Sequence, residues 1–158
     1  MICTNAQRTE MAIPILRMKF KDFLDNGLIP IYNDLIILSH IGSYFVSLSD
    51  QTVQNLYLNY EVFETLEHRY HLNLAAGLLL AIGGNIKRAL IFEDVVGYSW
   101  LLIDTGRIIE RVKYHCSAHH LNCREIVSPD IFRYLNRILG FSGNYYSIIG
   151  LLEIGGHE

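Results

Sequence analysis

The segment that decides the fold is "LNLAAGLLLAIGG", residues 72–84. It is an almost unbroken apolar run that ends in two glycines, which is typical of a strand buried on both faces of a sheet. Its densest part, "LAAGLLLAI", has nine residues, whereas a helix that crosses a bilayer needs ~20. The segment therefore predicts a central strand and no membrane span.

The chain after this strand predicts helix, strand, helix and strand. Residues 101–121 have helical apolar spacing, and "CREIV" (123–127) predicts a short strand. Ser128 is a predicted helix N-cap with Pro129 at the first helical position, and Gly140 is placed to end that helix. The run "YYSIIGLLEIGG" (145–156) predicts the last strand. Residues 85–100 fit a helix and a strand equally well.

The chain before the central strand has weaker signals. Residues 8–24 carry apolar side chains at helical spacing, and residues 51–70 do the same over a longer stretch. Between them, two β-rich runs (28–32 and 34–38) flank the turn signal "ND", and "SYFVSLS" (43–49) alternates like a strand. This order predicts a single α+β domain over residues 1–158.

Composition indicates a surface that another chain covers. Hydrophobic residues make up 51% of the sequence and charged residues only 18%, against about 25% charged in an ordinary domain. We expect a large apolar interface with a partner or a second copy. The net charge of -3 and the absence of a basic run argue against nucleic-acid binding. Three cysteines without framework spacing and no signal-like start predict a cytoplasmic protein.

The stretch "HCSAHHLNC", residues 115–123, raises the question of a metal site. His115 and His119 would share a helix face, as two zinc ligands do, and Cys116 and His120 form a second such pair. A complete site needs further ligands, and neither HExxH nor paired CxxC is present. The spacing favours the end of a helix that runs into a strand, and we expect no metal.

Two other groups of residues allow a functional and a structural interpretation. Gly83-Gly84-Asn85 could let a phosphate approach the backbone, but a turn that ends the strand is favoured because no P-loop or GxGxxG is complete. Glu93 and Asp94 are adjacent carboxylates that would point in different directions, so a shared acid–base pair is disfavoured.

The C-terminal half resembles the SagB-type peptide dehydrogenases of the nitroreductase superfamily. The resemblance covers residues 78–156 and rests on the hydrophobic strand, "GY" at 97–98, "DTG" at 104–106 at the entrance of a long helix, "HL" at the end of that helix, and "LG" at 139–140. It implies a nitroreductase-like mixed sheet flanked by helices and truncated at the N-terminus.

The resemblance also implies a function. Such proteins use FMN to oxidise azolines to azoles during the maturation of ribosomally made peptides, and nitroreductase-like chains dimerise through the long helix. It therefore implies an oxidoreductase subunit with FMN, a peptide substrate, and a homodimeric or heteromeric partner along residues 104–120. Tyr98, Arg124 and Glu125 are the candidate cofactor contacts.

Three departures limit this implication. The family's arginine-containing helix and "RPYPSGG"-like segment are not found before the matching region. Its lysine–tyrosine pair corresponds to Phe92 and Glu93, and Phe92 can neither donate nor accept a proton. Residues 124–127, "REIV", stand where glycines would approach the flavin. The catalytic residues stay unknown, and three hypotheses remain: a subunit whose flavin site a partner completes, a catalytically degenerate scaffold or partner subunit, or an unrelated α/β metal-binding or interaction domain.

Overall fold

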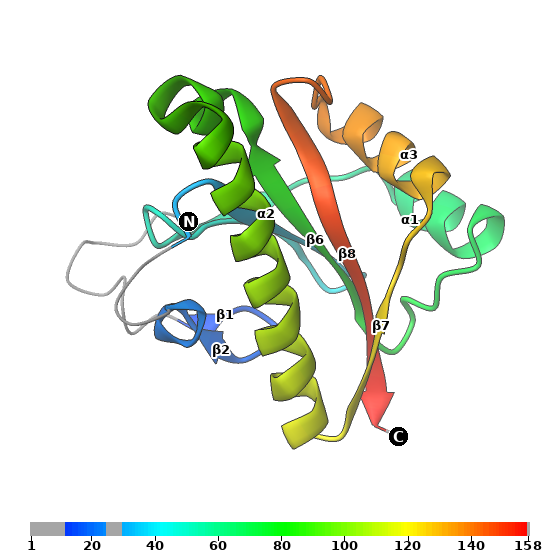
Figure 1. The fold of residues 1–158 in the computed structure, drawn as a ribbon. Coiled ribbons are helices and arrows are strands. Elements are labelled where there is room, and N and C mark those ends of the chain that lie inside the picture. The colour runs from blue at the N-terminus through cyan, green and yellow to red at the C-terminus, as the bar shows by residue number, and fades with distance from the viewer. Residues whose placement is uncertain (1–11, 25–29, 158) are drawn as a thin grey trace.

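A six-stranded sheet forms the centre of the molecule, with helices on both faces (Figure 1). The structure is a computed structural model, and it describes residues 12–24 and 30–157. The strand order is β5-β4-β3-β6-β8-β7, and each neighbouring pair is antiparallel. The strands are β3 (Asn33–Leu38), β4 (Ser43–Ser47), β5 (Thr52–Leu56), β6 (Leu78–Asn85), β7 (Leu121–Glu125) and β8 (Tyr146–His157).

The apolar segment at 72–84 supplies β6, and the prediction of a strand buried on both faces is confirmed. Leu78, Leu80 and Ile82 belong to the core on one side of the sheet, whereas Leu79 and Ala81 belong to the core on the other. This division follows from the alternation of side chains along a strand. β6 pairs with β3 on one edge and with β8 on the other, so the backbone groups on both of its edges have hydrogen-bond partners as well.

The long helix α2 (Ile86–Ala118) covers one face of the sheet. Its buried residues Ile108, Ile109, Val112 and Cys116 pack against apolar side chains of the sheet. The same core includes the short hairpin β1 (Ala12–Ile13) and β2 (Met18–Lys19) and the 3-10 turn η2 (Phe20–Phe23). The ambiguous stretch 85–100 is thus helical, and α2 begins well before the "DTG" at 104–106.

A sharp break at Asp94 divides α2. Asp94 has φ 54° and ψ −139°, which no α-helix contains. Beyond the break, a Cβ on Gly97 would lie 2.2 Å from the Ala89 carbonyl oxygen, eight residues earlier in the chain. Eight residues of straight helix would span about 12 Å. The first two turns of α2 therefore fold back against the continuing helix, and the missing side chain of Gly97 makes the contact possible.

Three shorter elements cover the opposite face of the sheet: α1 (Tyr60–Glu64), the π-helical turn η3 (Thr65–Arg69) and α3 (Pro129–Leu139). The predicted ends of α3 are confirmed. The Ser128 hydroxyl accepts the Ile131 amide at 3.5 Å, and Gly140 ends the helix with φ 77°. The α+β class and the helix-flanked sheet are confirmed too.

The predicted helix at 8–24 is wrong for the residues that the structure describes. Ile15 and Arg17 have φ values of 71° and 57°, and they close the turn between β1 and β2. The apolar residues that suggested a helix are buried all the same, as members of a hairpin and a 3-10 turn. Residues 8–11 of this prediction lie outside the described residues.

Two further predictions are corrected. Asn33 and Asp34 begin β3 and do not form a turn, and the described residues 30–32 of the run before them form no strand. Residues 52–56 of the predicted helix at 51–70 form β5, because they pair with β4 in the register Val46↔Val53. The helix starts later, where the Asn59 side chain accepts the Glu61 amide at 3.0 Å. In the described part of the chain, no helix has the length and apolarity that a membrane span requires.

Candidate functional site

A polar cleft opens where β3, β4 and β5 approach the start of α2. Its volume is about 260 Å³. Its lining combines carboxylates, hydroxyls, amides and one guanidinium: Ile31, Tyr32, Asp34, Phe45, Ser47, Ser49, Asp50, Thr52, Gln54, Asn85 and Arg88. Such a lining offers both hydrogen-bond donors and acceptors, which suits a polar ligand such as a peptide segment better than an apolar ring.

Asp34 is the most strongly perturbed acid of the cleft. The Tyr146 hydroxyl donates to Asp34 Oδ2 at 2.6 Å, and the two residues come from β8 and β3. Burial raises the pKa of Asp34, while the Tyr146 hydrogen bond opposes this rise and the nearby charge of Asp50 adds to it. Burial and the Asp34 charge raise the pKa of Tyr146. Asp34 therefore binds a proton more readily than an exposed aspartate does.

The start of α2 forms the cationic wall of the cleft. Asn85 caps the helix by accepting the Arg88 amide at 3.0 Å, and the Lys87 amide donates to the Tyr145 carbonyl at 3.0 Å. The Arg88 guanidinium lies 5.7 Å from the centre of the Phe92 ring. Arg88 therefore links the polar cleft to the surface that carries Phe92.

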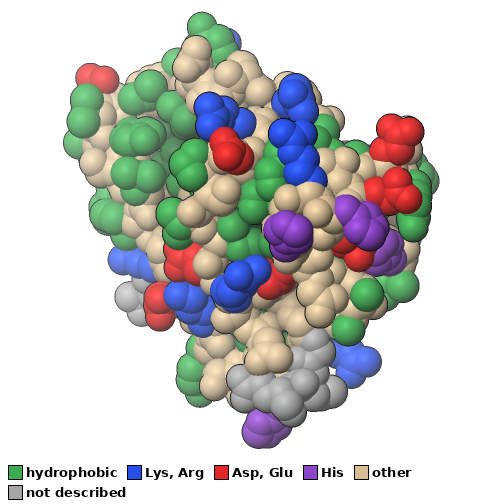
Figure 2. All heavy atoms as spheres, turned by 90° about the vertical axis from the view of Figure 1, so that its right-hand side faces the viewer, with side chains coloured by type: hydrophobic (Ala, Val, Ile, Leu, Met, Phe, Trp, Pro, Cys, Tyr) green, Lys and Arg blue, Asp and Glu red, His purple; other side chains and the backbone are tan. Residues whose placement is uncertain are grey.

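That surface is the exposed apolar face of α2, defined here as the large hydrophobic residues between positions 90 and 103 that contact solvent. The most exposed are Ile91, Phe92, Val95 and Val96, at 60–70%. The others are Leu90, Tyr98, Trp100, Leu102 and Ile103. In Figure 2, hydrophobic side chains gather at the upper left of the view with an acidic side chain at their edge, whereas the basic side chains and histidines of the upper half lie nearer the centre and the right.

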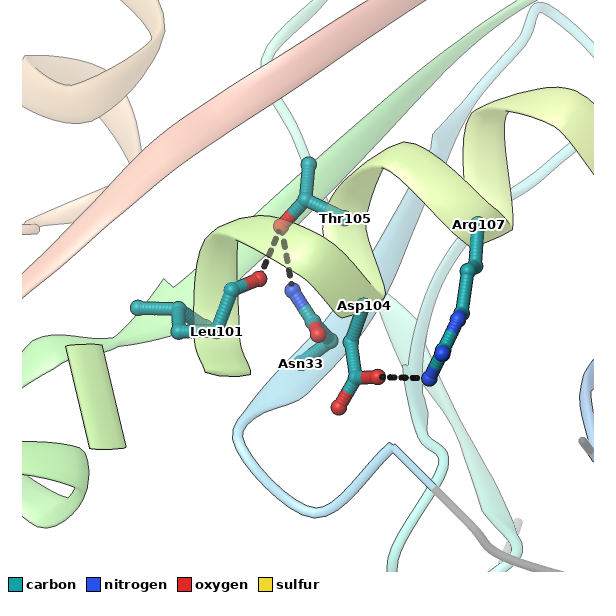
Figure 3. A network of polar contacts seen from close by, with 5 residues as sticks. All are labelled: Asn33, Leu101, Asp104, Thr105 and Arg107. Carbon is teal, nitrogen blue, oxygen red and sulfur yellow. Dashed lines mark hydrogen bonds and ion pairs between the residues drawn. The ribbon is translucent and has the colours of Figure 1, made fainter. Parts of the chain in front are cut away.

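A buried polar network fixes the middle of α2 to β3 (Figure 3). The Asn33 amide donates to the Thr105 hydroxyl at 2.9 Å and to the Gly83 carbonyl at 3.3 Å, and the Thr105 hydroxyl donates to the Leu101 carbonyl at 2.8 Å. The Asn33 Oδ1 atom has no hydrogen-bond partner among the described residues. At the surface beside this network, the Arg107 guanidinium lies 3.5 Å from Asp104 Oδ1.

The cofactor contacts predicted from sequence are not brought together in one chain. Arg124 and Glu125 lie on β7, where Arg124 pairs with Glu153 at 2.9 Å and Glu125 with Lys113 at 3.2 Å. Tyr98 lies on α2, fifteen residues before Lys113, which corresponds to about 22 Å along a helix. A single small ligand could not contact all three from one side.

Phe92 and Glu93 stand directly before the break at Asp94, and both are exposed. Neither lines the cleft. Sequence reasoning missed Asp34 and Asp50, which line the cleft, and Tyr146, which donates a hydrogen bond to Asp34. The sequence signal for Asp34 is a carboxylate at the edge of a buried apolar run. The same "ND" at 33–34 is also typical of a turn, and the turn is the interpretation that proves wrong.

The glycines at 83–84 leave space for this chain's own side chains. A Cβ on Gly83 would lie 2.4 Å from the Tyr146 hydroxyl oxygen, and one on Gly84 would lie 2.1 Å from the Ile149 Cδ1 atom. Both residues are within β6 and do not form the expected turn at its end. The space above them is therefore filled, and they do not form a cradle for a phosphate.

The "HCSAHHLNC" stretch is the junction between α2 and β7, as predicted. His115 Nε2 lies 2.8 Å from the Leu16 carbonyl, and His119 Nδ1 lies 2.9 Å from the His115 carbonyl. His120, with φ 57°, reverses the chain toward β7. Across residues 12–24 and 30–157, no three His, Cys, Asp or Glu side chains form a group that could hold a metal.

A complete FMN site does not fit the residues of a single chain. A flavin phosphate needs arginines, free backbone amides or a helix terminus. Arg124 already pairs with the Glu153 carboxylate, the first amides of α2 are engaged by Asn85 and Tyr145, and the glycine pair is covered. We therefore derive no chemical step through a flavin.

The fold is similar to those of solved nitroreductase-like proteins. No family model and no curated protein matches this sequence. A protein from Anabaena variabilis assigned as a nitroreductase superposes with a TM-score of 0.63 at 14% identity, over 79% of this chain and 27% of that one. A second, from Ralstonia eutropha, gives 0.60 at 13% identity, over 85% and 61%.

The third similar structure is the Escherichia coli microcin synthetase McbBCD complex with truncated pro-MccB17 bound. The TM-score is 0.66 at 13% identity, over 82% of this chain and 53% of that chain. This chain thus spans less than two thirds of each of the three proteins. These similarities show a nitroreductase-like fold, as the sequence predicted.

Proposed function

We propose that this chain is a nitroreductase-like partner subunit of a multi-subunit, peptide-modifying oxidoreductase complex. In this proposal the complex oxidises azoline rings or the backbone of a ribosomally made peptide, and another subunit holds the flavin. The observation that carries the proposal is the exposed apolar face of α2, because such a face requires cover. The similarity to a microcin synthetase complex supports a heteromeric arrangement.

The size of this face is sufficient to support association. Burying a large apolar side chain fully is worth about 1.5–3 kcal/mol. Ile91, Phe92, Val95 and Val96 are about two thirds exposed, so together they could contribute about 4–8 kcal/mol. Association costs at least ~4 kcal/mol in lost freedom, so these four side chains offset the lower end of that cost. Burial of the other residues of the face then contributes the net favourable free energy of association.

The position of the face differs from the one expected from sequence. Residues 104–118 of α2 turn Ile108, Ile109, Val112 and Cys116 into the core, and Tyr114 is their only large exposed hydrophobic residue. The exposed residues concentrate between 90 and 103. We therefore propose that the partner contacts the first half of α2, including the turns that fold back at Asp94.

The polar cleft is the proposed position of a peptide segment. Its hydroxyls and amides can form hydrogen bonds with the backbone of the peptide. The carboxylates of Asp34 and Asp50 can accept a hydrogen bond from the peptide or pair with one of its basic side chains. Arg88 lines the cleft and also lies over Phe92 on the apolar face. A partner on that face would thus form a further wall of the cleft and enclose the peptide.

Arg88 lies between the cleft and the exposed apolar face of α2. This position favours a second candidate function, a flavin site that is completed across the interface. Arg88 would then be the cation that this chain contributes near the partner, and Tyr98 could contact the cofactor from the same face. In this arrangement the missing phosphate contacts come from the other subunit.

One co-purification experiment tests these proposals. The tagged chain is expressed alone and with its genomic neighbours, and each preparation is examined for bound proteins and for flavin absorbance. Capture of a neighbour, with loss of capture in Val95→Glu, supports the partner role. Tyr114→Glu is the matched control on the same helix and should retain the partner. Flavin only in the complex supports the split site, provided that Arg88→Ala lowers its content while the complex persists.

Other outcomes would contradict the proposal. Stoichiometric flavin in the chain purified alone would overturn the partner role. Loss of capture in Tyr114→Glu with capture retained in Val95→Glu would place the interface along residues 104–120 instead.

A further inference from the structure

Two cysteines lie where α2 ends and β7 begins. Cys116 is in the last turn of α2, and Cys123 is in the middle of β7. His120 reverses the chain between them. Cys116 is fully buried in the core between α2 and the sheet, and Cys123 packs against the same core while remaining partly exposed.

The contact between the two thiols is asymmetric. The proximity of Cys123, together with burial, raises the pKa of the Cys116 thiol. The proximity of Cys116 lowers the pKa of Cys123, and the positive charge of Lys113 adds to this effect, whereas burial and Glu125 oppose it. Cys123 is therefore the thiol that ionises first, and it is also the one that solvent can reach.

Lys113 is fixed near the pair by an ion pair. Its Nζ atom lies 3.2 Å from Glu125 Oε1, which links α2 to β7 across the same junction as the cysteines. Lys113 precedes Cys116 by three residues on the helix, and Glu125 follows Cys123 by two residues on the strand. A partly exposed thiol with a lowered pKa, beside a cation and a second thiol, is the arrangement that favours attack on an oxidant.

We propose that Cys123 and Cys116 are a dithiol site that reduces hydrogen peroxide and closes to an intramolecular disulfide. The Cys123 thiolate attacks one peroxide oxygen, the O–O bond breaks, and the departing hydroxide takes up a proton to leave as water. The resulting sulfenic acid is then attacked by the Cys116 sulfur. An S–S bond forms, the S–O bond breaks, and the Cys116 proton leaves with the hydroxyl as the second water. Two thiols are oxidised and one peroxide is reduced.

The sequence makes this product easy to detect. Trypsin cleaves after Lys113 and Arg124, so both cysteines fall within the single peptide 114–124, "YHCSAHHLNCR". The chain carrying Cys3→Ser is treated with hydrogen peroxide, alkylated and digested. We expect this peptide to lose two hydrogen atoms and to take up no alkyl group, and reduction with dithiothreitol should restore two alkylation sites.

Single variants separate the two roles. In Cys116→Ala, Cys123 should stop at the sulfenic acid, which dimedone labels. In Cys123→Ala, Cys116 should stay unreacted. Circular dichroism establishes that each variant is folded. Two further variants retain both cysteines: Lys113→Gln should slow alkylation of Cys123 near neutral pH, and Glu125→Gln should accelerate it.

Three results would overturn the proposal. The first is full alkylation of both cysteines after peroxide treatment. The second is dimedone labelling of Cys116 in the absence of Cys123. The third is equal alkylation rates in the Lys113 and Glu125 variants. None of these results depends on a partner subunit or a flavin, so the proposed function and this site can fail separately.

Discussion

Replacing Gly97 with alanine tests whether the first turns of α2 fold back as described. An ideal Cβ at this position would lie 2.2 Å from the Ala89 carbonyl oxygen and 2.9 Å from the Glu93 Cβ atom. The obstacle at 2.2 Å is a main-chain atom, which cannot rotate away as a flexible side chain could. The substitution should therefore push the folded-back turns away from the continuing helix.

The magnitude follows from two opposed effects. Overpacking of this kind costs ~1–3 kcal/mol, and the upper part of that range applies because the backbone must move. Alanine gains about 1 kcal/mol over glycine in helix propensity, so the net loss should be about 1–2 kcal/mol. Gly106 is the control, since it lies in the same helix with no atom within 4 Å of its ideal Cβ. Gly106→Ala should gain about 1 kcal/mol.

Urea unfolding followed by circular dichroism measures both changes, and thermal scans provide a second readout. The two variants should differ by about 2–3 kcal/mol, which corresponds to about 4–12 °C in Tm for a chain of this size. Gly97→Ala should also weaken capture of the partner, because the displaced turns carry Arg88 and Phe92. A Gly97 variant as stable as the Gly106 variant would refute the folded-back geometry.

Three further predictions concern the cleft and the network beneath it. Gly83→Ala should destabilise the fold by about 1–3 kcal/mol, since its methyl group meets the Tyr146 ring; in a Tyr146→Ala background calorimetry should show a smaller loss, and an undiminished loss would exclude this contact as the cause. Thr105→Val should cost about 1–3 kcal/mol in urea unfolding, because the buried Asn33 amide loses its acceptor at 2.9 Å, and Thr105→Ser should retain most of that stability. Burial raises the pKa of Asp34 in the folded chain, so its contribution to stability is present below the ordinary value of about 3.9 and is lost as the pH rises through the higher folded value. Asp34→Asn should flatten this fall in unfolding titrations, and parallel pH profiles for the two proteins would contradict it.

The C-terminal half could be predicted from sequence because its signals are local. Ser128, Pro129 and Gly140 set the ends of α3 through side-chain caps and a left-handed φ, and neither depends on distant residues. β6 was predictable because burial on both faces leaves a continuous apolar run. The prediction for the N-terminal half was wrong where one apolar pattern fits two structures. Ile13, Leu16, Phe20 and Phe23 are spaced as in a helix, yet positive φ values at Ile15 and Arg17 turn the chain into a hairpin.

The candidate site was harder to predict because it depends on contacts between distant parts of the chain. Asp34 and Tyr146 are 112 residues apart, and only the sheet brings them together, because β3 and β8 lie on either side of β6. Composition did predict exposed apolar residues, since few charged residues were available to cover the surface. It could not place those residues between positions 90 and 103, because the break at Asp94 has no clear local signal in the sequence.

The position of β8 has a consequence for how the molecule is assembled during synthesis. β8 follows β7 in the chain but lies between β6 and β7 in the sheet, and it is the only described neighbour of β7. When β7 leaves the ribosome it has no strand to pair with, and one edge of β6 is open as well. Both strands must wait until α3 and β8 have been translated. A nascent chain stalled within α3 would therefore expose two unpaired strand edges, of which that of β6 is apolar and open to aggregation.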